Sequence, residues 1–530
     1  MRPAALLAAL AVLVMAPPPA VGAETPPPIT EAEAIEAARR DPKVREEQQK
    51  NPDLAPNATM NEGHWEVGWF AHGDEPALVL VDSRSGEVLE SWTGYQVAWK
   101  MARGYSGAFG HKLDAPYVFL PLCVLFLLGL VDWRRLWRVA NLDLLVLLGF
   151  GVSHYFFNRA EIGVSVPLQY PVLVYFLGRC LWIGLRGRGE GVRPVWPTLS
   201  LLLVALLLVG FRVGLNVADS GAIDVGYAGV VGADRIAHGE PIYDNLPDGI
   251  SDGDTYGPVN YLGYLPFERI WPWSGSWDDL PAAHAAAIVF DLATFVFLVF
   301  LGLRIRPGPE GDRLAAVLAF GWAAYPYTAY VLESNSNDSL VAMLLVATLL
   351  MLARPIAHGA ALALATWAKF VAAPLAPMLL TYERRLRPAA LFAAGFALVT
   401  VAVLLWPAID PGLKTFYDRT IASQAGRESP FSIWGQAPSL EPLRLTLLAA
   451  TAALSLLLAF TPRRKSLVQV AALGAGLLIA LQLTLHHWFY LYIVWFYPLL
   501  LVALASLPAT SWTEERGASP ARKSPPVPAG

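Results

Sequence analysis

The sequence predicts a polytopic α-helical membrane protein with a small α+β domain near its N-terminus. Of its 530 residues, 55% are hydrophobic and only 15% are charged. A soluble domain carries about 25% charged residues, so this composition excludes a single soluble globule. The apolar residues gather in long runs, and a bilayer core requires about 20 such residues per helix. Soluble enzymes, transcription factors and secreted disulfide scaffolds are therefore excluded.

Charge and cysteine content narrow the class further. The formal net charge is −4, which argues against a nucleic-acid partner held through phosphate contacts. The two cysteines, Cys123 and Cys180, lie in apolar runs, without a CxxC motif or a Cys/His cluster. We therefore expect neither thiol redox chemistry nor a metal site.

Residues 1–23 have the layout of a secretory signal peptide. A short basic start precedes an apolar stretch at residues 4–15, and the small residues at 21–23 resemble a cleavage site. An apolar stretch of this length is too short to span a bilayer stably. An uncleaved anchor is the alternative, and in either case the chain after Glu24 lies outside the cytoplasm.

Residues 24–112 are predicted to form a separate extracytoplasmic α+β domain. Residues 29–49 read as one helix, with Thr30 as N-cap and Glu33 completing a capping box. Strands are expected at residues 64–70, 77–82 and 88–92, with a turn at 82–87.

The order of these elements carries a resemblance. A helix followed by a hairpin that ends in VDSRSGEVLESW resembles a PepSY-like domain, a small extracytoplasmic module attached to membrane proteins. No residue in it has a catalytic pattern, so the domain is interpreted as a packing or regulatory module.

The remainder of the chain is predicted to cross the membrane about eleven times. Residues 113–196 hold additional transmembrane helices, and the expected spans are 116–131, 139–156, 168–185, 197–217, 283–303, 314–331, 338–353, 389–407, 442–460, 467–485 and 488–507. Arginine clusters follow the first, third, fifth and ninth spans, which places those ends in the cytoplasm. The loops 218–282 and 408–441 then lie outside. The tail 508–530 is cytoplasmic and disordered by composition.

One apolar segment does not fit a simple crossing. Residues 360–380 lead into Arg384, Arg385 and Arg387, which a full crossing would place outside. A re-entrant pair of half-helices resolves the conflict, with 360–369 rising and 371–380 returning. Backbone that is broken at membrane depth must line protein or a wet cavity, so Lys369 is expected near the turn, inside such a cavity.

The outer loop 218–282 is acidic and aromatic. Carboxylates with aromatic rings suit sugars, because ring faces stack on C–H groups and carboxylates accept hydrogen bonds from hydroxyls. An ordinary solvated loop with interfacial aromatic residues has the same composition, so composition leaves both interpretations open.

The order of motifs in residues 197–507 resembles the GT-C glycosyltransferases. An Asp beyond an outward-going span precedes a Tyr, then Pro241-Ile242-Tyr243-Asp244, then Tyr256-Gly257-Pro258. Later motifs, Trp367-Ala368-Lys369-Phe370 and His486-His487-Trp488-Phe489-Tyr490, follow in the same order. The pattern is most similar to glycosyltransferase family 87, the polyprenyl-phosphate-mannose-dependent mannosyltransferases. The family has three residues between the Asp and the Tyr, whereas Asp224 and Tyr227 are separated by two.

The resemblance implies a fold, a reaction and a set of residues. The reaction moves a sugar, mannose by family default, from a polyprenyl-phosphate donor to a glycolipid, wall-glycan or protein acceptor. A carboxylate deprotonates the acceptor hydroxyl and cations stabilise the departing phosphate, in one inverting displacement without cofactor or metal. Asp224 is the implied base, with Asp219 as the alternative. The implied substrate-binding residues are Tyr227, Tyr243, Tyr256, Glu333 and Asp338, and the implied phosphate-binding residues are Lys369, Arg427, His486 and His487.

Alternatives remain open at two levels. Lys369 is a charge at membrane depth, and an ion pair with Asp291 would explain it without a ligand. The whole chain also fits a lipid or sugar transporter or flippase, or a membrane sensor or assembly factor that uses its exported domain. Each interpretation places the protein in the plasma membrane, with the N-terminal domain outside and the C-terminus in the cytoplasm.

Overall fold

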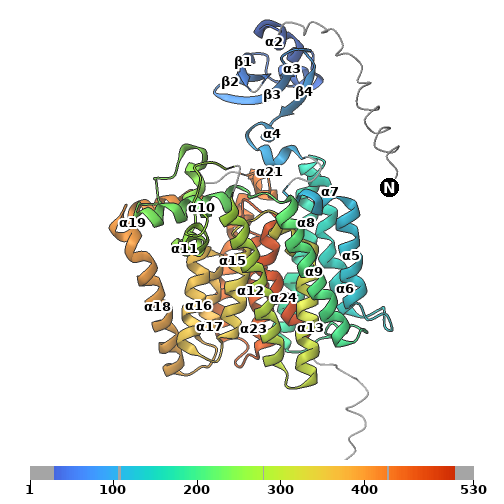
Figure 1. The fold of residues 1–530 in the computed structure, drawn as a ribbon, viewed down its shortest axis with the longest axis vertical. Helices are drawn as coiled ribbons and strands as arrows, with labels where there is room; N and C mark the ends of the chain where they lie inside the picture. The colour runs from blue at the N-terminus through green and yellow to red at the C-terminus, as the bar shows by residue number, and fades with distance from the viewer. Residues whose placement is uncertain (1–28, 62, 105–108, 278–279, 426–428, 508–530) are drawn as a thin grey trace, which may run out of the picture. The chain divides into compact units, whose positions relative to one another are not determined.

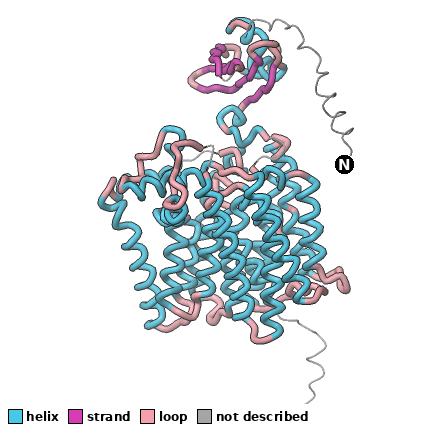
Figure 2. The backbone as a smooth tube through the Cα atoms, in the orientation of Figure 1, coloured by secondary structure: helices cyan, strands magenta, loops and turns pink. Residues whose placement is uncertain are grey.

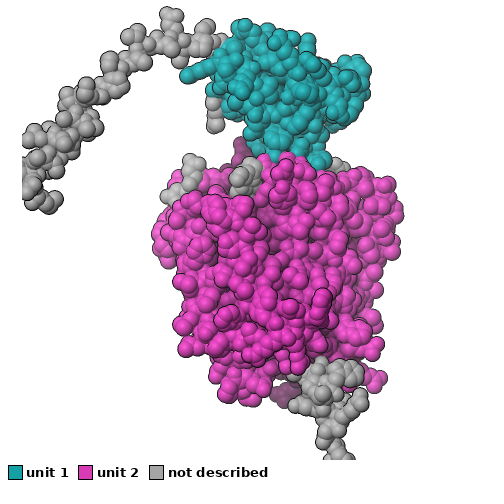
Figure 3. All heavy atoms as spheres, turned by 90° about the vertical axis from the view of Figure 1, so that its right-hand side faces the viewer, with its two compact units in different colours: residues 1–103 teal, residues 104–530 magenta. Residues whose placement is uncertain are grey.

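The computed structural model describes residues 29–61, 63–104, 109–277, 280–425 and 429–507. The predicted signal peptide and C-terminal tail lie outside these residues. The chain divides into two compact units, residues 1–103 and residues 104–530, coloured separately in Figure 3. Each unit is described by itself.

The first unit is a four-stranded antiparallel sheet with two helices against one face. The strands, in spatial order, are β1 (Ala55–Asn61), β2 (His64–Ala71), β3 (Asp74–Asp82) and β4 (Val88–Thr93), and Figure 2 draws them in magenta. Three of these strands match the expected ones. The first strand was missed, because its sequence APNATMN lacks the apolar alternation that marks a half-buried strand.

The single helix expected at residues 29–49 is wrong. The structure has two helices, α2 (Glu31–Arg39) and α3 (Pro42–Lys50). The chain breaks at Asp41, whose side chain caps α3 by accepting a hydrogen bond from the Lys43 N–H, while Pro42 occupies the first helical turn. The capping box on α2 is confirmed, since Thr30 and Glu33 each accept a hydrogen bond from the other's backbone N–H.

The expected turn at residues 82–87 is stabilised by one carboxylate. Asp82 Oδ1 accepts hydrogen bonds from the N–H groups of Arg84 and Ser85, at 3.0 and 2.6 Å. These hydrogen bonds hold the pKa of the Asp82 carboxyl below its ordinary value. The turn is therefore fixed by the same Asp and Ser residues that predicted it.

The second unit is helical, and its long helices run side by side in Figure 1. They are α5 (Pro116–Leu130), α6 (Val139–Leu148), α7 (Phe150–Phe157), α8 (Ile162–Arg186), α9 (Thr198–Asp219), α12 (Pro281–Ile305), α13 (Pro309–Ala324), α14 (Pro326–Glu333), α15 (Asp338–Leu350), α16 (Pro355–Ala368), α18 (Leu386–Ile409), α22 (Glu441–Phe460), α23 (Leu467–Gln482) and α24 (Ile493–Ser506).

The described residues contain six helices long and apolar enough to cross a membrane, or seven if the bent pair α13–α14 counts as one span. The other apolar helices have 10–17 residues. The expected count of eleven spans therefore stays a prediction.

Helix α18 exposes most of its apolar surface. Its apolar window is only 11% buried, and Leu398 and Val401 are 68% and 64% exposed. A soluble protein rarely exposes apolar surface of this extent. These apolar helices indicate a membrane protein.

The segment expected to re-enter does double back. Trp367, near the end of α16, donates a hydrogen bond to Thr400 of α18. The chain then returns through a 3₁₀ helix (η4, Phe370–Leu375) and α17 (Ala376–Leu380). Pro355 and Leu379 line one small pocket, so the two ends of the hairpin meet. Whether this hairpin lies at membrane depth stays a prediction.

Residues 218–282 and 408–441 were expected as loops, but the structure finds helices in both. The first contains α10 (Asp224–His238), a 3₁₀ helix (η3, Asp248–Asp254) and α11 (Pro258–Glu268). The second contains α19 (Leu413–Tyr417), a π-helical turn (η5, Asp418–Ala422), α20 (Ser423–Ala425) and α21 (Ile433–Gln436). Figure 1 shows α10, α11 and α19 at the same end of the bundle, which we call the loop end.

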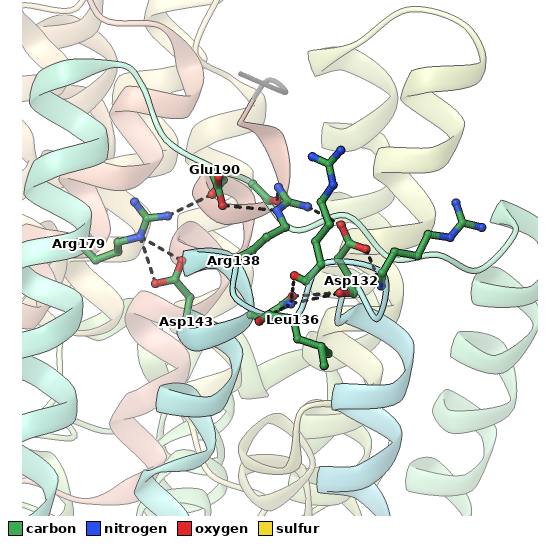
Figure 4. A network of polar contacts seen from close by, with 10 residues as sticks. Asp132, Leu136, Arg138, Asp143, Arg179 and Glu190 are labelled. Carbon is green, nitrogen blue, oxygen red and sulfur yellow. Dashed lines mark hydrogen bonds and ion pairs between the residues drawn. The ribbon is translucent and has the colours of Figure 1, made fainter. Parts of the chain in front are cut away.

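A polar network joins several helices of the second unit (Figure 4). Arg179 of α8 contacts both carboxylate oxygens of the fully buried Asp143, at 3.1 and 3.0 Å. Arg138 donates to the Gly191 carbonyl at 2.9 Å, and the Val192 N–H donates to the Leu504 carbonyl of α24. The network thus joins α6, α8 and the end of α24.

Candidate functional site

A buried polar segment separates α14 from α15. Residues 334–337 read Ser-Asn-Ser-Asn, and each is at most 1% exposed. Glu333 and Asp338 flank the segment and are buried to the same extent. A row of buried polar residues is costly unless they bind one another or a ligand, so this segment is the centre of the candidate site.

The start of α10 docks on this segment. The Ile223 N–H donates to the Ser334 carbonyl at 3.1 Å, and Asn335 Nδ2 donates to the Gly221 carbonyl at 3.2 Å. A Cβ atom added to Gly226 would lie 2.2 Å from the Asn335 carbonyl oxygen. Only glycine therefore permits this approach of α10.

The two candidate bases have different surroundings. Asp224 is the first residue of α10 and is exposed. Asp219 is the last residue of α9 and forms an ion pair with Lys112 at 3.1 Å. It also accepts a hydrogen bond from the Lys112 N–H at 3.2 Å. Lys112 therefore holds the Asp219 carboxylate through both its ammonium group and its backbone N–H.

Lys369 lies where the chain reverses between α16 and η4, with extended backbone angles. Its ammonium group donates to Asn337 Oδ1 at 2.9 Å and contacts Asp338 Oδ1 at 2.5 Å. The expected alternative, an ion pair with Asp291, is wrong. Asp291 instead pairs with Arg212 of α9 at 2.8 Å, and both are buried.

Three aromatic rings surround the Lys369 ammonium. It lies 5.1 Å from the ring centre of Tyr256, 5.4 Å from that of Tyr492 and 5.0 Å from that of Trp495. The Trp495 indole N–H also donates to Asp338 Oδ1 at 2.7 Å. Cation–π contacts stabilise a partly desolvated ammonium. Tyr256 is thereby placed at the site.

The other two predicted tyrosines lie in aromatic packing. Tyr227 stacks on Trp277 with 4.6 Å between ring centres. Tyr243 is 1% exposed and donates to the Tyr256 carbonyl at 3.0 Å. Burial raises the pKa of Tyr243 well above its ordinary value, so this hydroxyl remains a donor. Tyr243 therefore positions the Tyr256 backbone.

Glu333 is the most unusual carboxylate of the group. It is fully buried, and neither carboxylate oxygen has a hydrogen-bond partner among the described residues. It interacts electrostatically with Arg212 and with Asp219, both on α9. Glu333 therefore faces α9, beside the start of α10.

The two histidines point to different partners. His486 Nε2 lies 3.0 Å from Glu441 Oε2, and Glu441 also pairs with Arg444 at 2.6 Å. His487 Nδ1 lies 3.0 Å from Ser429 Oγ, and its ring centre lies 6.1 Å from that of Tyr492. His487 is thus linked to the Lys369 pocket through Tyr492. Arg427 lies outside the described residues.

Sequence reasoning missed an ion pair that joins residues 218–282 to residues 408–441. Arg419 of η5 donates to both carboxylate oxygens of the fully buried Asp254, at 2.7 and 2.8 Å. Asp254 also accepts from the Asp244 N–H at 2.7 Å. Residues 165 positions apart form this pair, so no local pattern signals it. Asn337, Tyr264 and Trp495 were missed too. Asn337 lies in a short polar loop between two expected spans, and Tyr264 and Trp495 read as ordinary helical residues.

The part of the chain that the structure describes contains no group of three or more His, Cys, Asp or Glu side chains placed to hold a metal ion. The independence from metal stays a prediction.

Comparison with known proteins adds no family. No protein-family model, curated protein or solved structure matches the chain. The fold and the site define a mostly helical protein with six or seven candidate membrane spans and a small antiparallel sheet domain.

Proposed function

We propose that the protein is an integral-membrane glycosyltransferase. It moves a sugar, mannose in the simplest case, from a polyprenyl-phosphate donor to an extracytoplasmic glycolipid, wall-glycan or protein acceptor. The observation that carries the proposal is the Lys369 ammonium, held among three aromatic rings beside the buried polar segment on which the helix of Asp224 docks.

Asp224 is proposed as the base. It is exposed at the first turn of α10, whereas Asp219 forms an ion pair with Lys112. A general base must reach the hydroxyl whose proton it removes, and an exposed carboxylate meets an incoming acceptor. Tyr227, on α10, and Glu333, at the end of α14, are proposed to bind substrate.

Lys369 is proposed to bind the donor phosphate. An ammonium shielded from water by rings interacts more strongly with a phosphate than a solvated one does. His486, His487 and Arg427 supply further positive or hydrogen-bonding groups. Asp338 holds Lys369 in place before the donor arrives.

One short segment links the helix of Asp224 to Lys369. Ser334 contacts the start of α10 and Asn337 contacts Lys369. Consecutive Cα atoms are 3.8 Å apart, so the Cα atoms of Ser334 and Asn337 are separated by at most about 11 Å. We therefore propose that the acceptor and the donor phosphate bind at the two ends of this segment.

The chemistry is a single displacement. The acceptor oxygen bonds to the anomeric carbon while the bond from that carbon to the phosphate oxygen breaks. The acceptor proton passes to Asp224, and polyprenyl phosphate leaves with the electron pair beside Lys369. The anomeric configuration is inverted.

The test uses the full chain in lipid nanodiscs with radiolabelled polyprenyl-phosphate-mannose and a membrane lipid extract. Transfer by the wild type should fall at least 100-fold in Asp224→Asn, because general-base catalysis contributes about 10²–10⁴-fold. Asp248→Asn is the matched control, since Asp248 is also exposed and also begins a helix of the same segment.

Three outcomes count against the proposal. Transfer that persists in Asp224→Asn moves the base to Asp219 or Glu333. No transfer and no donor binding by the wild type removes the transferase. Movement of the labelled lipid between leaflets without transfer establishes the transporter instead.

A further inference from the structure

We infer that Asn337, Asp338 and Tyr264 form the pocket that binds the sugar ring of the lipid-linked donor. This inference rests on the proposed function. In that proposal Lys369 binds the donor phosphate, and these three side chains would recognise the sugar attached to it. It starts from polar atoms that are buried beside Lys369 and have no hydrogen-bond partner among the described residues.

Three such atoms gather at this site. They are Asn337 Nδ2, Asp338 Oδ2 and the Tyr264 hydroxyl, on residues that are at most 1% exposed. Asn337 accepts a hydrogen bond from Lys369 through its amide oxygen, and Asp338 does so through its other carboxylate oxygen. The Tyr264 hydroxyl interacts electrostatically with Asp338. A buried polar atom without a partner is destabilising. The fold nevertheless retains two such atoms on the side chains that hold the Lys369 ammonium, and a third on Tyr264, which interacts with Asp338.

The chemistry of the three atoms indicates a polyhydroxylated ring. The amide nitrogen is a donor, the carboxylate oxygen is an acceptor, and a tyrosine hydroxyl is both. Neighbouring sugar hydroxyls need this mixture, because each one donates and accepts. The rings of Tyr256, Tyr492 and Trp495 supply apolar faces beside the same ammonium. A phosphate alone would use only donors and would leave Asp338 Oδ2 unpaired.

The donor sugar fits the site better than an acceptor sugar. The sugar of a polyprenyl-phosphate donor is bonded directly to the phosphate, so a phosphate at Lys369 carries the ring to the neighbouring polar atoms. In the proposed reaction an acceptor approaches from Asp224, on the helix that contacts the polar segment at Ser334. The occupant we assign is therefore the donor sugar.

Tyr264→Phe is the sharpest variant, because it removes only a hydroxyl that has no hydrogen-bond partner within the described part of the chain. We expect its affinity for polyprenyl-phosphate-mannose to fall about fivefold, since a hydrogen bond contributes roughly 1 kcal/mol. Affinity for polyprenyl phosphate without a sugar should not change. Resistance to unfolding should stay equal or rise, because a buried unpaired group is removed. If Tyr264 had only a structural role, the variant would lose stability and the ratio of the two lipid affinities would stay unchanged.

Tyr261→Phe is the matched control on the same helix. Tyr261 is also fully buried and packs against a glycine of α10, Gly232, as Tyr264 packs against Gly229. Its hydroxyl, however, donates to the Gly253 carbonyl at 2.8 Å. This variant should lose stability and leave the ratio of the two lipid affinities unchanged.

A panel of monodeoxy donors completes the test with the full chain in nanodiscs. In the wild type, one or more deoxygenations should weaken binding, and Tyr264→Phe or Asp338→Asn should abolish the penalty of one of them. If Asp338→Asn does not fold, because it disrupts the pair with Lys369, Tyr264→Phe alone decides.

The outcomes separate the inference from the proposed function. If neither lipid binds the wild type, both fail. If both lipids bind equally well, or Tyr264→Phe weakens both alike or neither, only the sugar pocket fails. If Tyr264→Phe weakens a free mannoside acceptor and not the donor, the assignment to the donor is wrong.

Discussion

Single residues decide how closely the elements of the site approach. Lys369 was predicted where the chain reverses, and the structure places it between α16 and η4. Its partner, however, differs from the predicted alternative. Asp291 was the candidate because both residues lie in apolar runs. In the structure Asp291 forms an ion pair with Arg212, and Asp338 forms one with Lys369. Charges in an apolar interior pair with their nearest partner in space, and helix packing fixes that distance.

Gly226→Ala is expected to destabilise the site. The added Cβ would meet the Asn335 carbonyl oxygen at 2.2 Å, and backbone atoms cannot move aside as a side chain can. Overpacking of this kind costs about 1–3 kcal/mol. Thermal unfolding in nanodiscs should show the loss, together with reduced sugar transfer.

Gly214→Ala provides the control on α9. A Cβ atom there meets nothing within 4 Å, so alanine should be neutral or add up to about 1 kcal/mol through helix propensity. If both variants unfold at the same temperature, the close approach at Asn335 is not what requires glycine.

Whole elements were predicted where hydropathy runs are long and uniform. The ends of α9, α12 and α18 lie within a few residues of the expected spans. The expected span 314–331 instead became α13 and α14, which are bent by 55°. Pro326 lacks a backbone N–H and cannot continue the helical bonding. The helices within residues 218–282 and 408–441 were missed, because the residues they pack against lie far away in the sequence.

Arg419→Lys is expected to destabilise the local structure of residues 248–254, within the segment 218–282. The guanidinium binds both oxygens of Asp254 through two nitrogens, and a lysine offers only one point charge. The hydrogen bond to Asp254 raises the pKa of Arg419, so the wild-type contact is present throughout the physiological pH range. Amide exchange in residues 248–254 should become about 10- to 100-fold faster, since a charged hydrogen bond contributes roughly 1.5–3 kcal/mol.

Lys414→Ala is the control for that exchange experiment. Lys414 is 91% exposed and pairs with Asp418 on the same short stretch, so its loss should leave residues 248–254 unchanged. Equal exchange in the wild type and Arg419→Lys would show that other contacts hold the segment.

At the scale of the whole molecule, the additional helices 113–196 pack into the bundle. Gly184 and Cys180 of α8 lie against Leu473 and Gly476 of α23. Gln469 of α23 donates to the Gly184 carbonyl at 2.8 Å. Small residues permit such close contact between helices in apolar surroundings, so α8 belongs to the same compact unit as α23.

Asp143→Asn is expected to destabilise this unit. Asp143 is fully buried, and it binds Arg179 at 3.0 Å and the Tyr175 hydroxyl at 2.7 Å (Figure 4). Removing one partner of a buried ion pair costs about 3–5 kcal/mol. Heat or denaturant unfolding in nanodiscs measures the loss.

Glu190→Gln tests the exposed part of the same network. Its side chain is 44% exposed and lies 3.4 Å from Arg138, so its loss should cost less than about 1 kcal/mol. A similar cost for both variants would mean that burial does not govern this network.

The sequence by itself determined the class of the protein and the position of most helices. Hydropathy, proline and capping residues act over a few neighbouring positions, so they can be read along the chain. The capping box at Thr30 and the reversal at Lys369 were found in this way.

Only the tertiary structure decided the partners. The pairs Lys369–Asp338, Arg212–Asp291 and Arg419–Asp254 join segments 31, 79 and 165 residues apart. The unpaired atoms of Asn337, Asp338 and Tyr264 are likewise visible only once burial is known. The energy of a buried polar group depends on which atoms surround it, and packing brings those atoms together from distant parts of the chain.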